Sequence, residues 1–215
     1  MENKEALDFF HKMSEKSQDP KSVKLAKGSD FSQMDADFIL KYADGNSTIL
    51  DLGSGTGLIV NKLSDKVKHV TAVEPFPSFT RFILQRDNIT IVNKTIEELE
   101  IQRNDYDFIT IFGVMHYFNE EESVGIYKKY QSALKSGGRG RIIIKNQFGV
   151  REDVVVEGYS EEQKSNYYAQ YRFIDKEVRN LQSVGFINVK VEDIYPLECN
   201  RWENTHFYAI VADKK

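Results

Sequence analysis

The sequence has very little cysteine: Cys199 is the only one among 215 residues. A disulfide within the chain is therefore excluded, and so is a metal site built from several thiolates. A lone cysteine is typical of a reducing compartment, and we expect a cytoplasmic protein. Long apolar runs are missing as well. The longest one, Phe108 to Met115, is far shorter than the roughly 20 residues that cross a bilayer, so no membrane partner is expected.

Runs of basic residues are also missing. Lysine and arginine together number 29 against 33 aspartates and glutamates, which gives a formal net charge of −4. Proteins that bind nucleic acid through its phosphates cluster their cations, so nucleic acid is not an expected partner. The first ten residues, MENKEALDFF, mix charges and contain no apolar core, so no secretory signal is expected.

What the chain does contain is a regular alternation of apolar strands and helices between residues 47 and 145. Strands that are apolar on both faces and alternate with helices indicate a parallel sheet covered on both sides. The fold class is therefore α/β. The predicted strands cover residues 48–52, 69–74, 89–92, 106–112 and 140–145, and the predicted helices cover 57–63, 79–85 and 120–134.

The alternation is extended at both ends. A helix over 173–183 precedes two more predicted strands, 187–194 and 205–212, and the short connection between these allows an antiparallel pair. The complete prediction is a three-layer sandwich around a seven-stranded, mostly parallel sheet whose last strand is antiparallel. Residues 1–46 are polar and predict a helical cap on a domain formed by 47–215.

The charged, tyrosine-rich segment 146–172 interrupts the alternation after the fifth strand. Because it follows a strand end, it can fold over a ligand site as a lid. An amphipathic helix whose tyrosines only cover the sheet is the alternative. Both interpretations stay open at this point.

The first predicted strand runs into a glycine-rich turn in the stretch ILDLGSGTGLI, residues 49–59. Ligands of parallel α/β sheets bind beyond the carboxyl ends of the strands. Position 58 is leucine, so the third glycine of the dinucleotide fingerprint is missing, and the Gly-Lys-Ser/Thr of a phosphate-binding P-loop is missing too. A turn of this kind is either a nucleotide site or only a tight junction between strand and helix.

Two acidic residues favour the nucleotide site. Glu74 ends the second predicted strand, where a carboxylate can accept hydrogen bonds from a ribose diol. Its alternative is a solvated carboxylate at a strand end. Asp51 lies within an apolar strand, and a buried aspartate needs partners such as the loop amides or a cationic ligand group.

Together these residues resemble the hhDhGxGxG motif of the class I S-adenosylmethionine-dependent methyltransferases. The later segments YDFITIFGVMHYF and LKSGGRGRIIIK are similar to further motifs of that family. The resemblance implies the family's Rossmann-like fold, S-adenosylmethionine as cofactor with S-adenosylhomocysteine as product, and no metal. The implied cofactor contacts are Asp51, Gly53, Ser54, Gly55, Gly57, Glu74, Pro75, Thr95, Ile96 and Gly113. Many relatives use an aspartate for adenine after the third strand; residues 93–97 lack one, so Thr95 or the Ile96 backbone is expected to replace it.

Methyl transfer mainly requires that the acceptor be aligned with the methyl group and that water be excluded. A hydroxyl acceptor also benefits from a general base, for which His116 and His206 are the candidates. The alternatives are packing beside the cofactor for His116 and a hydrogen-bonded strand histidine for His206. Tyrosine and arginine side chains suit recognition of a polar or anionic acceptor. The candidate substrate contacts are Tyr117, Asn146, Tyr168, Tyr171, Arg172 and Arg201.

The sequence therefore predicts a methyltransferase that acts on the oxygen or nitrogen of a small polar or anionic metabolite. The segments GYSEEQ…YYAQYR and NRWENTHFYAI are similar to small methyltransferases that resemble tailoring enzymes of bacterial surface-polysaccharide precursors, which implies a sugar or a phosphorylated capsule precursor. Two alternatives are a non-catalytic protein that binds S-adenosylmethionine and acts through a partner, and a nicotinamide-dependent oxidoreductase. The oligomeric state stays open.

Overall fold

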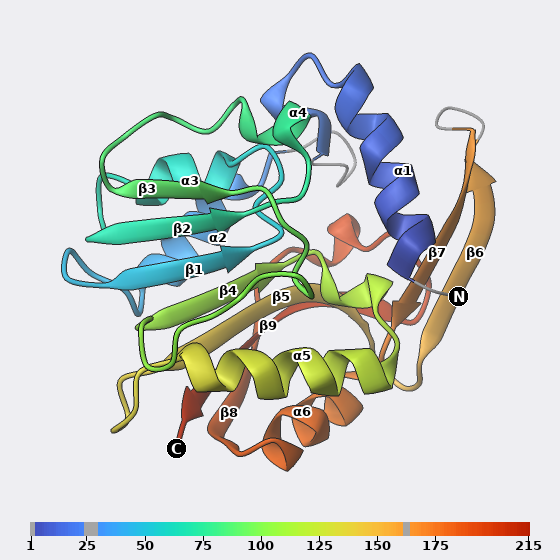
Figure 1. Cartoon of the computed structure of the whole chain (residues 1–215). Coiled ribbons are helices and arrows are strands. Elements are labelled where there is room, and N and C mark those ends of the chain that lie inside the picture. The colour runs from blue at the N-terminus through green and yellow to red at the C-terminus, as the bar shows by residue number, and fades with distance from the viewer. Residues whose placement is uncertain (1–2, 24–29, 161–163) are drawn as a thin grey trace.

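The fold is built on one seven-stranded sheet, in the order β3-β2-β1-β4-β5-β9-β8, and a separate two-stranded sheet, β6-β7 (Figure 1). The structure is a computed structural model, and it describes residues 3–23, 30–160 and 164–215. The strands are β1 Thr48–Leu52, β2 His69–Val73, β3 Ile89–Val92, β4 Phe108–Phe112, β5 Arg141–Gly149, β6 Val154–Ser160, β7 Ser165–Tyr171, β8 Phe186–Asp193 and β9 Thr205–Lys214.

The direction of the strands confirms the predicted sheet. Neighbouring strands from β3 to β5 pair in parallel, while β9 lies antiparallel between β5 and β8. Strand β1 lies between β2 and β4, so the strand order reverses direction beside β1. Figure 1 shows β1 and β2 pointing toward the side of the molecule where α1 and the β6-β7 hairpin lie. A ligand crevice is expected at this edge of such a sheet.

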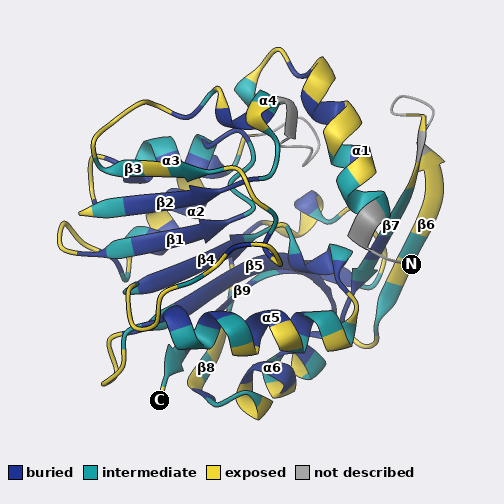
Figure 2. Ribbon diagram, viewed as in Figure 1, coloured by how far each residue is buried: buried dark blue, intermediate teal, exposed yellow. Residues whose placement is uncertain are grey.

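Helices cover both faces of the sheet and bury its apolar strands. On one face α5 and α6 pack over a cluster that includes Leu50, Ile109 and Ile144; on the other, α2 and α3 pack over Ile49 and Ile143. Figure 2 shows β4 and β5 buried over most of their length. The helices are α1 Asn3–Lys16, α2 Ser32–Leu40, α3 Leu58–Leu63, α4 Pro77–Thr80, α5 Glu120–Ala133 and α6 Ile174–Ser183, with 3-10 turns η1 Pro20–Val23, η2 Met115–Tyr117 and η3 Leu197–Cys199.

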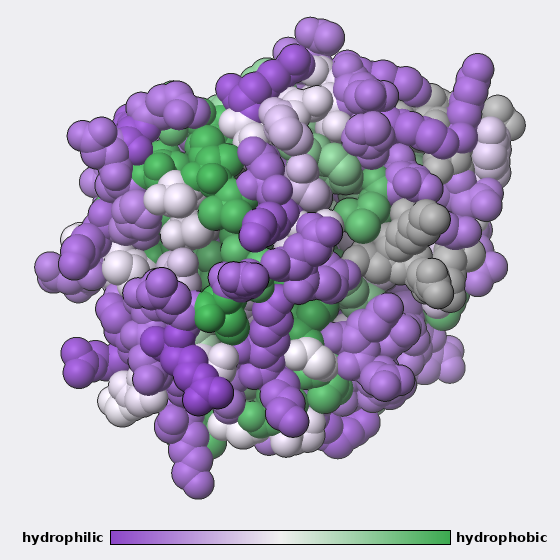
Figure 3. Space-filling model, in the orientation of Figure 1, coloured by the Kyte–Doolittle hydropathy of each residue, from purple (hydrophilic) through white to green (hydrophobic). Residues whose placement is uncertain are grey.

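Not every region of the sheet is covered by a helix. Residues 93–105, which follow β3, form turns and loops. Figure 3 shows hydrophobic side chains over β2 and β3, within a surface that is mostly hydrophilic. Among the described residues, no helix is long and apolar enough to cross a membrane.

Two predicted boundaries were wrong by more than two residues. Strand β5 was expected to end at residue 145 but continues to Gly149, because β9 supplies partners as far as the pair Gly149–Thr205. The helix expected over 79–85 is the shorter α4, which starts two residues earlier because Pro77 occupies its first turn.

The segment 146–172 forms the end of β5 and the β6-β7 hairpin, so the helical alternative is wrong. Its two hairpin strands, VVVEGYS and SNYYAQY, are rich in β-branched and aromatic residues, which favour extended structure. Helix α1 lies beside this hairpin: the rings of Phe9 and Tyr167 are 5.7 Å apart, and Lys12 Nζ donates to the Lys164 carbonyl at 3.1 Å. Helix α2 packs instead on α3, so of these two N-terminal helices it is α1 that lies beside the hairpin.

We expect the core around β5 to dominate stability. Ile143 is fully buried in β5, and Ile143→Ala should lower the free energy of unfolding by about 2–5 kcal/mol because it leaves a cavity. Denaturant unfolding measures this loss. The matched control is Ile187→Ala on β8, where the isoleucine is 41% exposed, and its expected loss is below about 1 kcal/mol. Equal losses in the two variants would contradict the assigned core.

Candidate functional site

A cavity of about 280 Å³ lies at the carboxyl edge of the sheet. We call the part lined by residues of the segments 51–59, 73–76 and 94–97 the glycine-loop half. The tyrosine half is the part lined by residues 116–118 and 145–147 and by single residues from the chain that follows. These single residues are Tyr167, Tyr171, Tyr195, Arg201 and Phe207. Phe9 and Phe10 of α1 line the same cavity, so the cavity extends from the strand ends to the first helix.

The glycine loop folds as it does because its three glycines take left-handed backbone angles. The φ values are 76° at Gly53, 54° at Gly55 and 75° at Gly57. Residues that carry a side chain rarely adopt this region of backbone angles. Gly53 and Ser54 donate their backbone N–H groups to the Val73 carbonyl at 2.9 and 3.0 Å, which ties the loop to β2.

The three glycines differ in what surrounds them. A Cβ atom on Gly53 would lie 2.4 Å from Val114, and one on Gly57 would lie 2.3 Å from Ile83. Gly53 and Gly55 line the cavity, whereas Gly57 does not. The structure therefore places Gly57 at the packed start of α3. Gly57 was predicted to contact the cofactor, but it does not face the cavity.

Glu74 lies against the glycine loop and is almost fully buried. Its Oε2 accepts a hydrogen bond from the Gly55 N–H at 3.0 Å, and its Oε1 accepts one from the Phe76 N–H at 3.2 Å. Burial raises the pKa of this carboxyl to about 7, against the effect of the two hydrogen bonds; the nearby charge of Asp51 adds to the rise. Glu74 therefore exchanges its proton near neutral pH at the wall of the cavity.

The other predicted cofactor contacts gather around the same half. Asp51 lines the cavity, and its Oδ1 accepts a hydrogen bond from the Thr110 hydroxyl at 2.5 Å. The carbonyl of Ile96 accepts from the Tyr130 hydroxyl at 2.6 Å, which fastens the 93–97 loop to α5. Ser54, Pro75, Thr95, Ile96 and Gly113 all line the cavity.

His116 and Asn146 form the polar centre of the tyrosine half. The His116 Nδ1 lies 2.7 Å from the Asn146 Oδ1. An amide oxygen only accepts, so Nδ1 carries the proton and Nε2 keeps its lone pair. The pKa of His116 is lowered to about 3, mainly by burial. The hydrogen bond to Asn146 opposes this shift, and the positive charges of Arg201, Arg172 and Lys145 add to it. His116 is thus neutral at pH 7 and is a weak proton acceptor in the ligand-free protein.

Aromatic rings form the walls around His116. The ring of Tyr171 stacks on that of His116 at 5.2 Å, and the Tyr171 hydroxyl accepts from Trp202 Nε1 at 3.1 Å. Helix α1 completes the wall, since Phe10 contacts Tyr117 with ring centres 5.2 Å apart. The predicted contacts Tyr117, Asn146 and Tyr171 are therefore brought together with His116 in the cavity.

Two cations line the tyrosine half, and they differ in their partners. Lys145 is buried, and its Nζ contacts Asp35 Oδ2 at 3.1 Å and the Tyr195 hydroxyl at 2.8 Å. Arg201 is exposed, and among the described residues no hydrogen bond or ion pair holds its guanidinium. Arg201 is therefore the cation that a ligand can pair with.

Besides Gly57, three predicted site residues lie outside the cavity. His206 has both ring nitrogens engaged, with Asn200 Oδ1 at 3.0 Å and Asp193 Oδ1 at 2.7 Å. Tyr168 pairs with Glu157 across the β6-β7 hairpin. The third, Arg172, is buried in a network of protein partners and is not available to a substrate.

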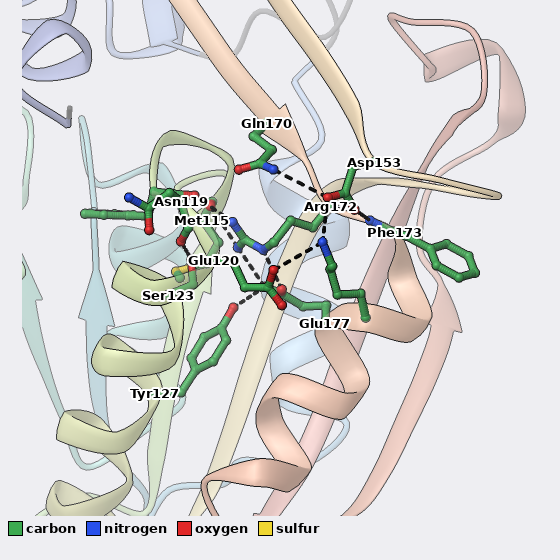
Figure 4. A network of polar contacts seen from close by, with 12 residues as sticks. Met115, Asn119, Glu120, Ser123, Tyr127, Asp153, Gln170, Arg172, Phe173 and Glu177 are labelled. Atoms are coloured by element: carbon green, nitrogen blue, oxygen red, sulfur yellow. Dashed lines mark hydrogen bonds and ion pairs between the residues drawn. The ribbon is translucent and has the colours of Figure 1, made fainter. Parts of the chain in front are cut away.

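Arg172 joins three elements of the fold (Figure 4). Its Nε and Nη2 donate to the Glu177 carboxylate of α6 at 2.6 and 2.9 Å. Its Nη1 and Nη2 also donate to the carbonyls of Phe118 and Met115, at 2.6 and 3.0 Å. Figure 4 shows the guanidinium between Met115 and Glu177. Because the two carbonyls flank His116 and Tyr117, Arg172 fixes the turn that presents both residues to the cavity.

Sequence reasoning missed several residues that line the cavity. Phe9 and Phe10 lie in the N-terminal segment, and their contacts with Tyr167 and Tyr117 are long-range features of the fold. Gln147 had a signal that was not used: the polar run Lys145-Asn146-Gln147 directly follows an apolar strand. Among the described residues, no cluster of histidine, cysteine and carboxylates could hold a metal ion.

The chain is similar to known methyltransferases in sequence over part of its length and in fold over most of it. A family model described as a methyltransferase domain matches residues 49–138, and no curated protein gives a significant match. Similar solved structures include a SAM-dependent methyltransferase of Leishmania major, with 20% identity and a TM-score of 0.74 over 99% of this chain and 82% of that one. The 1,6-didemethyltoxoflavin-N1-methyltransferase of Burkholderia thailandensis, with its substrate and S-adenosylhomocysteine bound, has 15% identity and a TM-score of 0.73 over 100% and 91%. An S-adenosylmethionine-dependent methyltransferase of Mesorhizobium loti has 15% identity and a TM-score of 0.66 over 87% and 99%.

The pKa of Glu74 predicts a pH dependence of ligand binding. At pH 8 the group is a carboxylate that can accept hydrogen bonds from ribose, and at pH 6 it is mostly protonated. For a pKa of about 7, the Kd for S-adenosylhomocysteine should rise about tenfold between pH 8 and pH 6. Calorimetric titration at both values measures this. Glu74→Gln should bind more weakly at pH 8 and vary little with pH; an equally steep profile in that variant would assign the titration to another group.

The buried ion pair of Arg172 predicts a large effect on stability. Arg172→Met leaves the Glu177 carboxylate buried without its cation and should lower the free energy of unfolding by about 3–5 kcal/mol. The control is Lys176→Met, which removes a partly exposed partner of Asp153 and should cost less than about 1 kcal/mol. Denaturant unfolding compares the two. A loss in Arg172→Met no larger than in the control would show that the network contributes little to the fold.

The segment matched by the family model contains the glycine loop, Glu74 and the η2 turn, and it ends before β5. It therefore covers the glycine-loop half but leaves Asn146, Tyr171 and Arg201 outside. The similar structures share the fold, and their names agree with S-adenosylmethionine as the predicted cofactor. Residues 49–138 thus match a methyltransferase domain, and the predicted fold of the class I S-adenosylmethionine-dependent methyltransferases is confirmed.

Proposed function

We propose that this methyltransferase uses the cavity to methylate an oxygen or nitrogen atom of a small, polar or anionic metabolite. The observation that carries the proposal is that the glycine loop and Arg201 line the same cavity. One half offers exposed loop backbone and a carboxyl group. The other offers tyrosines and the cation Arg201, which has no hydrogen-bond or ion-pair partner among the residues that the structure describes. A donor and an acidic acceptor can therefore meet in one enclosed space.

The glycine-loop half fits S-adenosylmethionine. The left-handed turns at Gly53 and Gly55 leave backbone without side chains at the wall of the cavity. Glu74 would accept hydrogen bonds from the ribose hydroxyls, and Thr95 and Ile96 would lie along the adenine. When bound, the cofactor supplies a methyl group on a sulfonium, and the electron pair of the broken carbon–sulfur bond stays on sulfur.

The tyrosine half would align the acceptor and exclude water. Arg201 can pair with a carboxylate or phosphate, and Tyr117 and Tyr171 supply contact area. The low pKa of His116 makes it a weak general base, and a neutral amine or an already anionic oxygen is a nucleophile that needs none. A sugar phosphate or another phosphorylated surface-polysaccharide precursor is an acceptor of this class.

Helix α1 and the β6-β7 hairpin are proposed to act as cap and lid of the cavity. Support comes from the contact of Phe9 with Tyr167, which joins α1 to the hairpin, and from the contact of Phe10 with Tyr117, which joins α1 to the η2 turn. Entry of an acceptor would then require these aromatic contacts to open. The cytoplasmic location and a partner set without nucleic acid remain predictions.

Calorimetric titration with S-adenosylmethionine, S-adenosylhomocysteine and NAD tests the proposal. We expect binding of the two sulfur ligands in the micromolar range, no binding of NAD, and release of S-adenosylhomocysteine when acidic metabolites are added with the methyl donor. Gly55→Val should abolish binding because a branched side chain is strained at φ 54° and fills space beside the loop. Binding without turnover on any acceptor would favour the non-catalytic alternative, and binding of NAD alone would favour an oxidoreductase.

A further inference from the structure

Strand β5 carries polar residues past the rest of the sheet. Its last pair with β4 is Phe112–Lys145. The following residues, 146–149, pair with β9, and Gly149 also forms a bridge with Phe173. Side chains alternate between the two faces of a strand. Asn146 therefore reaches His116 on one side, whereas Gln147 reaches Thr205 on the other, and both line the cavity.

A chain of hydrogen bonds sets the orientation of the Gln147 amide. The Thr205 hydroxyl donates its proton to the Trp202 carbonyl at 2.6 Å. Because its one proton is used, the Thr205 hydroxyl can only accept a hydrogen bond from Gln147. The amide nitrogen of Gln147 must therefore face Thr205 and donate to it. The Gln147 Oε1 consequently points away from Thr205.

This oxygen is buried and lacks a partner. The Gln147 side chain is 2% exposed, and no donor among the described residues reaches its Oε1. Most buried polar atoms in proteins are hydrogen-bonded, and leaving one unpaired costs free energy. At the wall of a ligand cavity, an unpaired acceptor is best explained by a ligand that supplies an O–H or N–H group.

Arg201 adds a charge requirement in the same cavity. The positive charge of Lys145 is already met by Asp35, whereas Arg201 has no hydrogen-bond or ion-pair partner among the described residues. A positively charged ligand would meet both cations, and a negatively charged ligand would be attracted by Arg201. The tyrosine half therefore selects an acid.

We propose that Gln147 and Arg201 form an acceptor subsite for a small acid that also carries a hydroxyl or amino group. The Gln147 Oε1 accepts a hydrogen bond from that group, and Arg201 pairs with the carboxylate or phosphate. The inference rests on the proposed function, because it takes the glycine-loop half to hold the methyl donor. It goes further by naming the two groups that the acceptor must combine.

Binding of matched probes to protein saturated with S-adenosylhomocysteine tests this subsite. 4-Hydroxybenzoate carries both groups, 4-methoxybenzoate lacks the donor, and methyl 4-hydroxybenzoate lacks the acid. Glucose 1-phosphate and glucose form a second pair, which distinguishes a phosphorylated sugar from a carboxylic acid. In at least one set, the compound with both groups should bind about tenfold more tightly than the one lacking the acid. In the benzoate set, it should also bind about fivefold more tightly than the one lacking the donor.

Variants assign these preferences to the two residues. Gln147→Met should remove the preference for the hydroxyl and keep that for the acid, and Arg201→Met should do the reverse. Gln131→Met is the matched control: the Gln131 amide donates to the Val184 carbonyl and does not line the cavity, so both preferences should persist. Because Arg201 is exposed, Arg201→Met is expected to fold. This variant therefore still tests the subsite if Gln147→Met fails to fold.

The outcomes separate the subsite from the proposed function. Failure of the wild-type protein to bind S-adenosylhomocysteine would refute the proposed function itself. Normal binding of that ligand would overturn the subsite alone in two cases: if no probe binds, or if the preferences are unchanged in both variants.

Discussion

The antiparallel pairing of β5 with β9 is the constraint on which the site depends. It runs from Arg141–Asp213 to Gly149–Thr205 and carries β5 beyond the end of β4. Hydrogen bonds to β9 pair the backbone N–H and C=O groups of this extension. Without β9 these groups would be unpaired at the edge of the sheet. Asn146 and Gln147 reach the cavity only because of this extension. The tyrosine half is thus a consequence of where β9 lies in the sheet.

The charged and polar groups around the cavity divide into those that build the fold and those that face the ligand. Arg172 with Glu177, and Lys145 with Asp35, are pairs in which each ion compensates the desolvation of the other. The first pair also binds the carbonyls around His116 and so fixes the position of a cavity residue. Arg201 and the Gln147 Oε1 lack such partners among the described residues, which is the pattern expected of groups that bind a ligand.

The two halves of the cavity arise in different ways. The glycine-loop half is formed by strand ends that are neighbours in the sheet, and Glu74 closes it through its bond to Gly55. The cost of burying the Glu74 carboxylate is visible in its raised pKa, which brings its proton exchange close to neutral pH. The tyrosine half is assembled from α1, the η2 turn, β5, β7 and the loop before β9, which are far apart in the sequence.

Features governed by local physics were determined by the sequence itself. The alternation of apolar strands and helices, the glycine-rich turn after the first strand and the acid at the end of the second strand follow from short-range patterns. Each lies in the part of the chain where it was predicted. Only the tertiary structure decided the rest. Arg172 was expected to face a substrate, but its partners Met115 and Phe118 lie more than 50 residues away in the chain. His206 is engaged by Asp193 across the β8-β9 connection, and the orientation of Gln147 depends on Thr205. A polar side chain takes its role from the partners that reach it, and these partners are set by the packing of distant elements.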